Sequence, residues 1–362
     1  MFVIDSHCDT PSILLEGVDL RNRGTRTHLD IPRIIEGGVD GIFYAIYIPA
    51  SFDYKMAVEH SLSLISKCYD FVETNRDSVN FAFSAEDAIS NKEQGLVSIF
   101  MGMENGSPIG ENLAFLRFYY KMGIRYLTLC HSRHNQICDS CAQVEPKWGG
   151  LSPFGVELVK ECNRIGMMID CSHVSDNTFY DVLKYSKVPV VATHSSCRSL
   201  CSHPRNMTDE MIRSLASAGG VIQINFYPFF IDEEFSKDPQ ISSLCDEYNN
   251  WQQLYRSDLR NEVYRDKYFA LAAKLNEYPT PSYKKVVDHI DHVVSLVGTK
   301  HVGLGSDFDG IEIAPQGLRD ISKFYRISEE LRLRGYTESE VSDIMGGNFL
   351  RVMREVAQKS AL

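Results

Sequence analysis

The chain has 362 residues, of which 44% are hydrophobic and 23% charged, proportions typical of a globular protein with a sizeable core. Its 37 lysine and arginine residues are outnumbered by 48 aspartate and glutamate residues, which gives a formal net charge of -11. This acidic balance argues against a nucleic-acid partner, which would need a basic surface, and mildly against anchoring to anionic lipid.

Neither end of the sequence predicts export or membrane attachment. The fifth residue is already charged and no basic segment precedes a long apolar run, so we expect no signal peptide. No run approaches the ~18 apolar residues of a membrane span, and residues 355–362 do not resemble a hydrophobic anchor signal. The ten cysteines are scattered, as buried thiols in a reducing compartment would be, so we predict a cytoplasmic protein. The pair Cys138-x-x-Cys141 lacks a second pair and is a weak candidate for a redox or zinc site.

Short apolar runs rich in β-branched and aromatic residues recur along the chain, with helix-length amphipathic segments between them. Eight runs follow this pattern: Phe2–Ile4, Gly41–Ile48, Leu96–Met103, Ile124–Leu129, Met167–Cys171, Val188–Thr193, Gly220–Phe226 and His301–Gly305. Strands that alternate with helices indicate parallel βαβ units, and eight such units predict a closed (β/α)₈ TIM barrel. No Gly-x-Gly-x-x-Gly follows the first run, which weighs against a dinucleotide-binding fold.

The spacing of the runs breaks once, because residues 227–300 separate the seventh run from the eighth. This is longer than an ordinary barrel crossover, so we predict an insertion at about 229–280 that includes a helix around Tyr248–Leu275. The segment Val286–Leu296 then supplies the regular barrel helix. Two interpretations of the insertion remain open: an excursion or oligomer contact, and a lid over the site. In the absence of internal repeats, we predict a single domain over residues 1–362.

Polar residues collect where the predicted strands end. Six of the eight runs end in histidine, aspartate or glutamate, and the residues concerned are His7, Asp9, Glu104, His131, His173, His194 and Asp307. Each one alone is more typical of a cap or a turn. However, the carboxyl ends of barrel strands meet on one face, where barrel enzymes carry their chemistry, so we expect these side chains to lie together. His301 begins its run and is left out of the set.

Imidazole and carboxylate ligands without thiolates favour Zn²⁺ or a similar borderline metal. Three histidines and two carboxylates suffice for two metal ions if one carboxylate bridges them, and Glu104 has the longer side chain for that role. Two ions about 3.5–4 Å apart hold a bridging hydroxide, whose pKa falls toward ~7. Hydrolysis of an acyl bond is the reaction class that this pattern predicts.

Several motifs, in order along the chain, resemble those of the membrane dipeptidase (renal dipeptidase) family of zinc peptidases. They are Asp5-Ser-His-Cys-Asp-Thr-Pro11, Gly102-x-Glu104, Leu127-Thr-Leu-x-His131, Gly166-Met-Met-Ile-Asp-x-Ser-His-Val-Ser175, Thr193-His-Ser-Ser196, Pro204-Arg-Asn206 and Gly305-Ser-Asp-Phe-Asp-Gly310. The match continues to Gly347-Asn-Phe-Leu-Arg-Val352 and so covers nearly the whole chain.

The resemblance implies a barrel of the metal-dependent hydrolase type with two Zn²⁺ ions per chain. His7 and Asp9 would bind one ion, His173 and His194 the other, and Glu104 would bridge them together with a water or hydroxide. It also implies a dipeptide as substrate, tolerance of a D-residue at its C-terminal side, and possible activity on β-lactam amides. Members of the family are commonly dimers, so a homodimer is possible here.

The resemblance implies three further roles. His131 would reach the scissile carbonyl and stabilise the oxyanion, Arg205 would bind the free carboxylate of the substrate, and Asp307 would move the proton from the water to the leaving amine. Because the export and lipid-anchor signals of animal members are not found, membrane attachment is not carried over. Two alternatives remain: a related amidohydrolase acting on N-acyl amino acids, lactones or β-lactams, and a non-catalytic scaffold on the same barrel.

Overall fold

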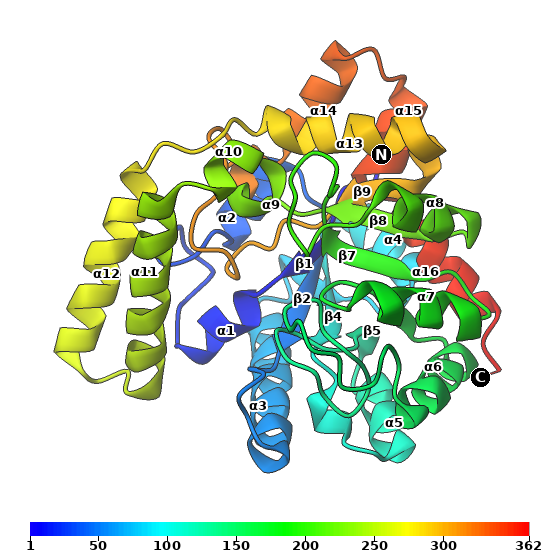
Figure 1. Ribbon diagram of the computed structural model, residues 1–362. Coiled ribbons are helices and arrows are strands. Elements are labelled where there is room, and N and C mark those ends of the chain that lie inside the picture. The colour runs from blue at the N-terminus through cyan, green and yellow to red at the C-terminus, as the bar shows by residue number, and fades with distance from the viewer. Residues whose placement is uncertain (362) are drawn as a thin grey trace.

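Eight parallel strands form a nearly closed barrel in the computed structural model, which describes residues 1–361 (Figure 1). Leu362, the last residue of the predicted domain, lies outside the described residues. The barrel strands, in their order around the sheet, are β1 (Ile4–Cys8), β2 (Gly41–Tyr47), β4 (Val97–Glu104), β5 (Ile124–Thr128), β6 (Met168–Asp170), β7 (Val191–Ser195), β8 (Val221–Ile224) and β9 (Val302–Leu304). All eight overlap or adjoin a predicted run, and the (β/α)₈ prediction is confirmed.

The barrel closes between β9 and β1 through a few contacts rather than a full ladder. Cys8 forms a single parallel bridge with Phe308, and the hydroxyl of Ser6 donates to the carbonyl oxygens of Leu304 (3.0 Å) and Thr193 (2.7 Å). A ninth strand, β3 (Val79–Phe81), pairs with the start of β4 outside the barrel order. Its three residues are too few to show a recognisable alternation, so this strand was not predicted from the sequence.

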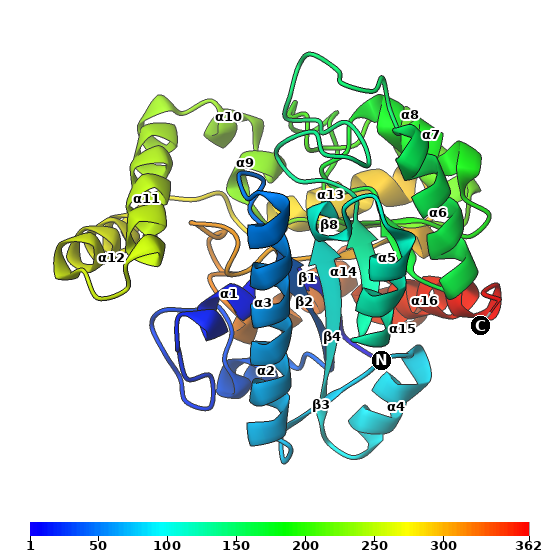
Figure 2. The same cartoon turned by 90° about the horizontal axis from the view of Figure 1, so that it is seen from below.

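Helices surround the barrel on its outside, as the two views show (Figures 1 and 2). The helices outside the insertion are α1 (Thr10–Leu15), α2 (Ile31–Gly37), α3 (Tyr54–Thr74), α4 (Ala85–Glu93), α5 (Leu113–Lys121), α6 (Pro153–Ile165), α7 (Asp176–Tyr185), α8 (Asp209–Ser217), α13 (Lys284–Val297), α14 (Tyr325–Leu333), α15 (Glu338–Ser342) and α16 (Asn348–Gln358). Short 3₁₀ turns cover Ser107–Ile109, Thr299–His301 and Ile321–Lys323, and a π-helical segment covers Asp343–Gly347. The helix α13 contains the predicted barrel helix Val286–Leu296.

The insertion lies between β8 and β9, the seventh and eighth barrel strands, and begins with α9 (Pro228–Ile231) and α10 (Glu233–Ser236). The helical structure predicted around 248–275 is present, but it is divided between two helices, α11 (Pro239–Ser257) and α12 (Glu262–Glu277). The chain breaks at Asn261, whose side chain accepts hydrogen bonds from two amides of the next helix and so caps it. The two helices form a hairpin that stands to one side of the barrel (Figures 1 and 2).

A small aromatic core of its own holds this hairpin together. It consists of Ile241, Cys245, Tyr248, Tyr255, Tyr268, Leu271 and Leu275, with Ile313 of the loop that follows β9. Because Ile313 joins this core, α11 lies against the carboxyl-end face of the barrel and does not extend freely into solvent.

Two findings bear on the sequence-based expectations about membranes and thiols. Within residues 1–361, we find no helix with both the length and the apolar character that a membrane crossing requires. All ten cysteines are free thiols in the described chain, and nine of them are buried. Cys138 and Cys141 therefore do not form a disulfide in the structure.

Candidate metal centre

All eight predicted site residues come together at the carboxyl ends of the barrel strands. Glu104 ends β4, the other predicted ligands lie in or just after β1, β6 and β7, and Asp307 follows β9. They meet at the bottom of a cavity of about 850 Å³ whose walls include Asp9, Glu104, His131, His173, Arg205 and Asp307. His7 and His194 lie beneath these side chains and are completely buried. A cavity of this size accommodates a small molecule.

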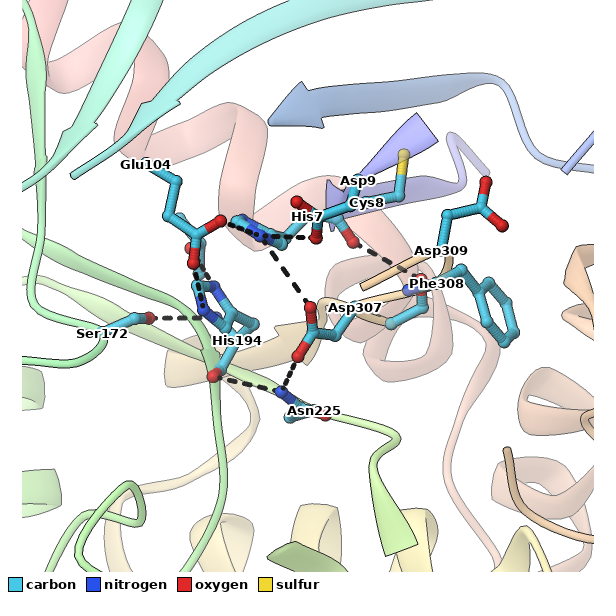
Figure 3. Close-up of polar contacts among 12 residues, drawn as sticks. His7, Cys8, Asp9, Glu104, Ser172, His194, Asn225, Asp307, Phe308 and Asp309 are labelled. Carbon is cyan, nitrogen blue, oxygen red and sulfur yellow. Dashed lines mark hydrogen bonds and ion pairs between the residues drawn. The ribbon is translucent and has the colours of Figure 1, made fainter. Parts of the chain in front are cut away.

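Glu104 occupies the centre of the cluster, and its two carboxylate oxygens face different histidines (Figure 3). Oε2 lies 3.4 Å from His7 Nε2. Oε1 lies 3.0 Å from His173 Nε2 and 3.6 Å from His194 Nε2. Asp9 Oδ2 completes the His7 side at 3.6 Å from the same Nε2. This arrangement has the form expected of a carboxylate shared by two metal positions.

The orientation of the imidazole rings suits metal binding. The Nδ1 atoms are occupied: that of His7 lies 2.7 Å from the hydroxyl of Tyr126, and that of His194 lies 2.8 Å from the hydroxyl of Thr193. Each Nε2 therefore points into the cluster, and that of His7 is buried without a hydrogen-bond partner. Metal-binding histidines commonly have their second nitrogen fixed in this way. The nitrogen and oxygen donors fit Zn²⁺.

The protonation states of these groups also favour a cation. Burial lowers the pKa of His173 and His194 well below the usual range, so both stay neutral, as a metal ligand must be. Burial and the charge of Glu104 raise the pKa of Asp9 to about 6. At His7 burial acts in the opposite direction, but the charges of Glu104 and Asp9 outweigh it and raise the pKa well above its usual value. Positive charge is therefore most strongly stabilised where the carboxylates converge.

The backbone is strained at two of the site residues. His173 and Asp307 adopt left-handed φ angles of 69° and 63°, a conformation that residues other than glycine seldom take. Such a conformation costs of order 1 kcal/mol and persists where the surrounding structure demands it, often at functional sites. Each residue lies three positions beyond the end of its strand, β6 or β9, where the chain turns at the rim of the barrel.

Two predicted non-ligands, His131 and Asp309, differ in their relation to the cluster. Burial, followed by the charge of Arg205, lowers the pKa of His131 to about 3, and its Nε2 lies 3.8 Å from Glu104 Oε1. It therefore lies beside Glu104 as a neutral ring. Asp309 points away from Glu104 (Figure 3). Its carboxylate accepts hydrogen bonds from Thr10 and Thr27. It acts as a structural residue of the turn.

Two residues that hold the cluster in place were not predicted from the sequence. Asn225 donates to Asp307 Oδ2 at 2.8 Å, and Tyr126 holds His7. Asn225 comes directly after the seventh strand, so a search of strand ends that included amides as well as charged residues would have found it. Tyr126 lies within β5, and its place depends on Gly102 of the neighbouring strand. A Cβ at Gly102 would lie 2.0 Å from the tyrosine ring.

The outer wall of the cavity comes from the insertion. Asn249, Gln252 and Arg256 of α11 line it opposite the strand ends, together with Tyr227, which follows β8. The insertion therefore contributes directly to the cavity wall.

Comparisons with known proteins agree with the geometry. The family described as membrane dipeptidase (peptidase family M19) matches residues 1–362. The chain is 31% identical to the dipeptidase verJ of Clonostachys rogersoniana over 375 residues, covering 99% of this chain and 85% of that protein. It is 33% identical to the dipeptidase aclJ of Aspergillus oryzae over 337 residues, covering 91% of this chain and 70% of that one.

Two solved structures share the fold over nearly their whole length. The probable dipeptidase PvdM from Pseudomonas aeruginosa superposes with a TM-score of 0.82 at 26% identity, covering 99% of this chain and 96% of that one. A metallopeptidase from Rhodobacter sphaeroides, solved with a phosphinate mimic of the dipeptide L-Ala-D-Ala, superposes with a TM-score of 0.81 at 26% identity. The match covers 98% of this chain and 99% of that one.

Proposed function

Because the chain belongs to the membrane dipeptidase family, peptidase family M19, and is therefore a metal-dependent dipeptidase, we propose that it hydrolyses dipeptides with a pair of zinc ions. In this proposal His7 and Asp9 hold one ion, His173 and His194 hold the other, and Glu104 binds both. The mimic of L-Ala-D-Ala in the Rhodobacter sphaeroides relative supports a substrate class that includes dipeptides with a C-terminal D-residue.

The observation that carries the proposal is the position of the Glu104 carboxylate between two sets of imidazole nitrogens. One oxygen is directed at His7, and the other at His173 and His194. When bound, two such ions supply an activated water and polarise the scissile carbonyl group. The remaining chemistry falls to the protein side chains around them.

Arg205 is the proposed anchor for the free carboxylate of the substrate. Its side chain lines the cavity, and Nη2 donates to the carbonyl oxygen of His194 at 2.9 Å, which fixes the guanidinium plane. Its Nε has no hydrogen-bond partner, and Nη1 has only a 3.5 Å contact with Ser195. These free donors match a carboxylate, which a guanidinium binds through two parallel hydrogen bonds.

His131 and Asp307 are proposed to act on the scissile bond itself. The neutral ring of His131 donates a hydrogen bond to the carbonyl oxygen as negative charge develops on it. Asp307 takes a proton from the attacking water and delivers it to the nitrogen of the leaving amine. Burial raises the pKa of Asp307, which suits a carboxyl group that must hold a proton briefly, and Asn225 fixes its orientation.

The test is a substrate panel assayed on zinc-loaded protein, with L,L and L,D dipeptides, C-terminally amidated dipeptides and N-acetylated amino acids. We expect hydrolysis of free dipeptides and about two zinc ions per active chain. Arg205→Ala should raise KM for free dipeptides at least about tenfold, because it removes charged hydrogen bonds to the carboxylate. Hydrolysis of N-acetylated amino acids but no dipeptide would replace the proposal with an amidohydrolase function. Equal rates for free and amidated dipeptides would remove the anchor role of Arg205.

A further inference from the structure

We propose that Arg256 on α11 forms a second anion-binding subsite, besides that of Arg205. This subsite selects dipeptides with an acidic side chain on the N-terminal residue. The inference rests on the proposed dipeptidase function and narrows its substrate class. It assigns the insertion a role in specificity, through the one guanidinium that α11 contributes to the cavity wall.

Arg256 faces the same cavity as the metal cluster but from the opposite wall. Its Nε donates to Glu16 Oε1 at 2.8 Å, which fixes the side chain, and the side chain lines the cavity and remains 32% exposed. Burial and the positive charge of Arg256 together lower the pKa of His60, another residue of this wall. Arg256 therefore belongs to the cavity wall, close enough to His60 for its charge to act there.

The charge of Arg256 is only partly compensated by its neighbour. Glu16 also accepts a hydrogen bond from Arg26 Nη2 at 2.9 Å, so two guanidinium groups share a single carboxylate. The adjoining residues of α11, Asn249 and Gln252, are neutral amides. Glu312 on the same wall accepts a hydrogen bond from Asn249. Arg256 binds Glu16 through Nε, so the Nη donors of Arg256 remain available for a substrate carboxylate.

The positions of Arg205 and Arg256 indicate which residue of a bound dipeptide lies near each arginine. Arg205 is bound to the carbonyl oxygen of His194 at the end of β7. Arg256 lies on the β1 side, held by Glu16 at the end of α1. A dipeptide whose C-terminal carboxylate is bound by Arg205, with its peptide bond at the metal cluster, directs its N-terminal residue toward Arg256.

The experiment compares four dipeptides that differ in the charge and position of one side chain: Glu-Ala, Gln-Ala, Ala-Glu and Ala-Gln. In the zinc-loaded wild type we expect kcat/KM for Glu-Ala to exceed that for Gln-Ala about tenfold, the factor that one charged hydrogen-bonded pair supplies. The ratio of Ala-Glu to Ala-Gln should stay near one. Arg256→Gln should reduce the first ratio to about one, and Arg256→Lys, which keeps the charge but loses the planar donors, should retain part of it.

Arg26→Gln is the matched control, because Arg26 pairs with the same Glu16 but does not line the cavity. It should keep the preference for Glu-Ala, and Glu16 remains paired in either single variant. A wild-type ratio of one or less, or a ratio unchanged in Arg256→Gln while both dipeptides are cleaved, would overturn the subsite and leave the dipeptidase proposal intact. Hydrolysis of none of the four peptides would overturn both. The wild-type ratios and the Lys variant test the subsite even if Arg256→Gln does not fold.

Discussion

The two walls of the cavity are built in different ways. The inner wall consists of strand ends, and its side chains are held by buried hydrogen bonds, such as that between Tyr126 and His7. The outer wall is one face of α11, a helix of 19 residues within the insertion. The apolar residues of α11 pack in a separate aromatic core, and its polar residues line the cavity. The inner wall is thus part of the barrel itself, whereas the outer wall is an addition to it.

This difference separates two tasks. The proposed ligands must keep their mutual distances whatever the substrate, and the interior of a barrel is suited to this because its strands are rigidly paired. Discrimination among dipeptides needs contacts only with the substrate side chains, which differ from one dipeptide to another. A helix outside the barrel can change its sequence without disturbing the strands. We therefore expect substitutions in the inner wall to affect kcat or metal binding, and substitutions in α11 to affect the choice of substrate.

The largest effect should come from Asp307→Asn in the inner wall. The amide cannot carry the proton, so we expect kcat to fall by about 10³-fold, within the range that general acid–base residues contribute. Metal content should stay near that of the wild type, because the predicted ligand set is intact. Steady-state kinetics and elemental analysis of the same preparation measure both quantities.

Asp309→Asn serves as the control for this variant, because Asp309 is a buried carboxylate of the same turn but points away from Glu104. Its kcat should fall far less. A comparable fall of kcat in both variants would mean that a change in the turn, and not the loss of proton transfer, lowers the rate. Loss of metal in Asp307→Asn would instead make Asp307 a ligand.

The inner wall was predictable from the sequence and the outer wall was not. His7, Glu104, His173 and His194 could be identified because each one ends or follows an apolar run, and the barrel geometry brings such ends together. Arg256 gave no comparable signal. It lies in a helix whose register against the barrel is set by packing, and a sequence pattern does not reveal which of its polar faces is turned inward.

The residues that hold the ligands form a third class. Tyr126 lies in the interior of a strand, and its role depends on Gly102, which leaves room for the ring on the neighbouring strand. This is a relation between two distant positions, so neither residue indicates it alone. The helix break at Asn261 was missed for a related reason: the helical pattern continues on both sides of it.

A pH-dependent effect should appear where the two walls join. His289 of α13 is completely buried; its Nδ1 accepts from the amide of Cys197, after β7, and its Nε2 lies 3.2 Å from the carbonyl oxygen of Ile231, in the insertion. Burial lowers the pKa of His289 to about 4 from its usual 6.5. The neutral ring is therefore favoured in the folded state, and its contribution to stability is present above about pH 6.5 and is lost as the pH falls toward about 4.

Between about pH 7 and about pH 4, the free energy of unfolding of the wild type should therefore fall by about 3 kcal/mol more than that of His289→Gln. Denaturant titrations at several pH values measure this difference. Val293→Ala, another buried change on α13, is the control and should lower stability by a similar amount at every pH. Parallel curves for the wild type and His289→Gln would show that this histidine does not titrate with unfolding.

The smallest effect concerns the support of the inner wall, in Tyr126→Phe. The ring keeps its place against Gly102, but His7 Nδ1 loses the hydroxyl that lies 2.7 Å away. Loss of such a supporting hydrogen bond weakens metal binding by about tenfold or somewhat more. Competition with a chelator measures the affinity. Tyr44→Phe is a closely matched control, because Tyr44 is also a fully buried barrel tyrosine, yet its hydroxyl has no hydrogen-bond partner. Equal metal affinities in the two variants would mean that the strand ends position His7 without this contact, and that the rigidity of the inner wall comes from the backbone alone.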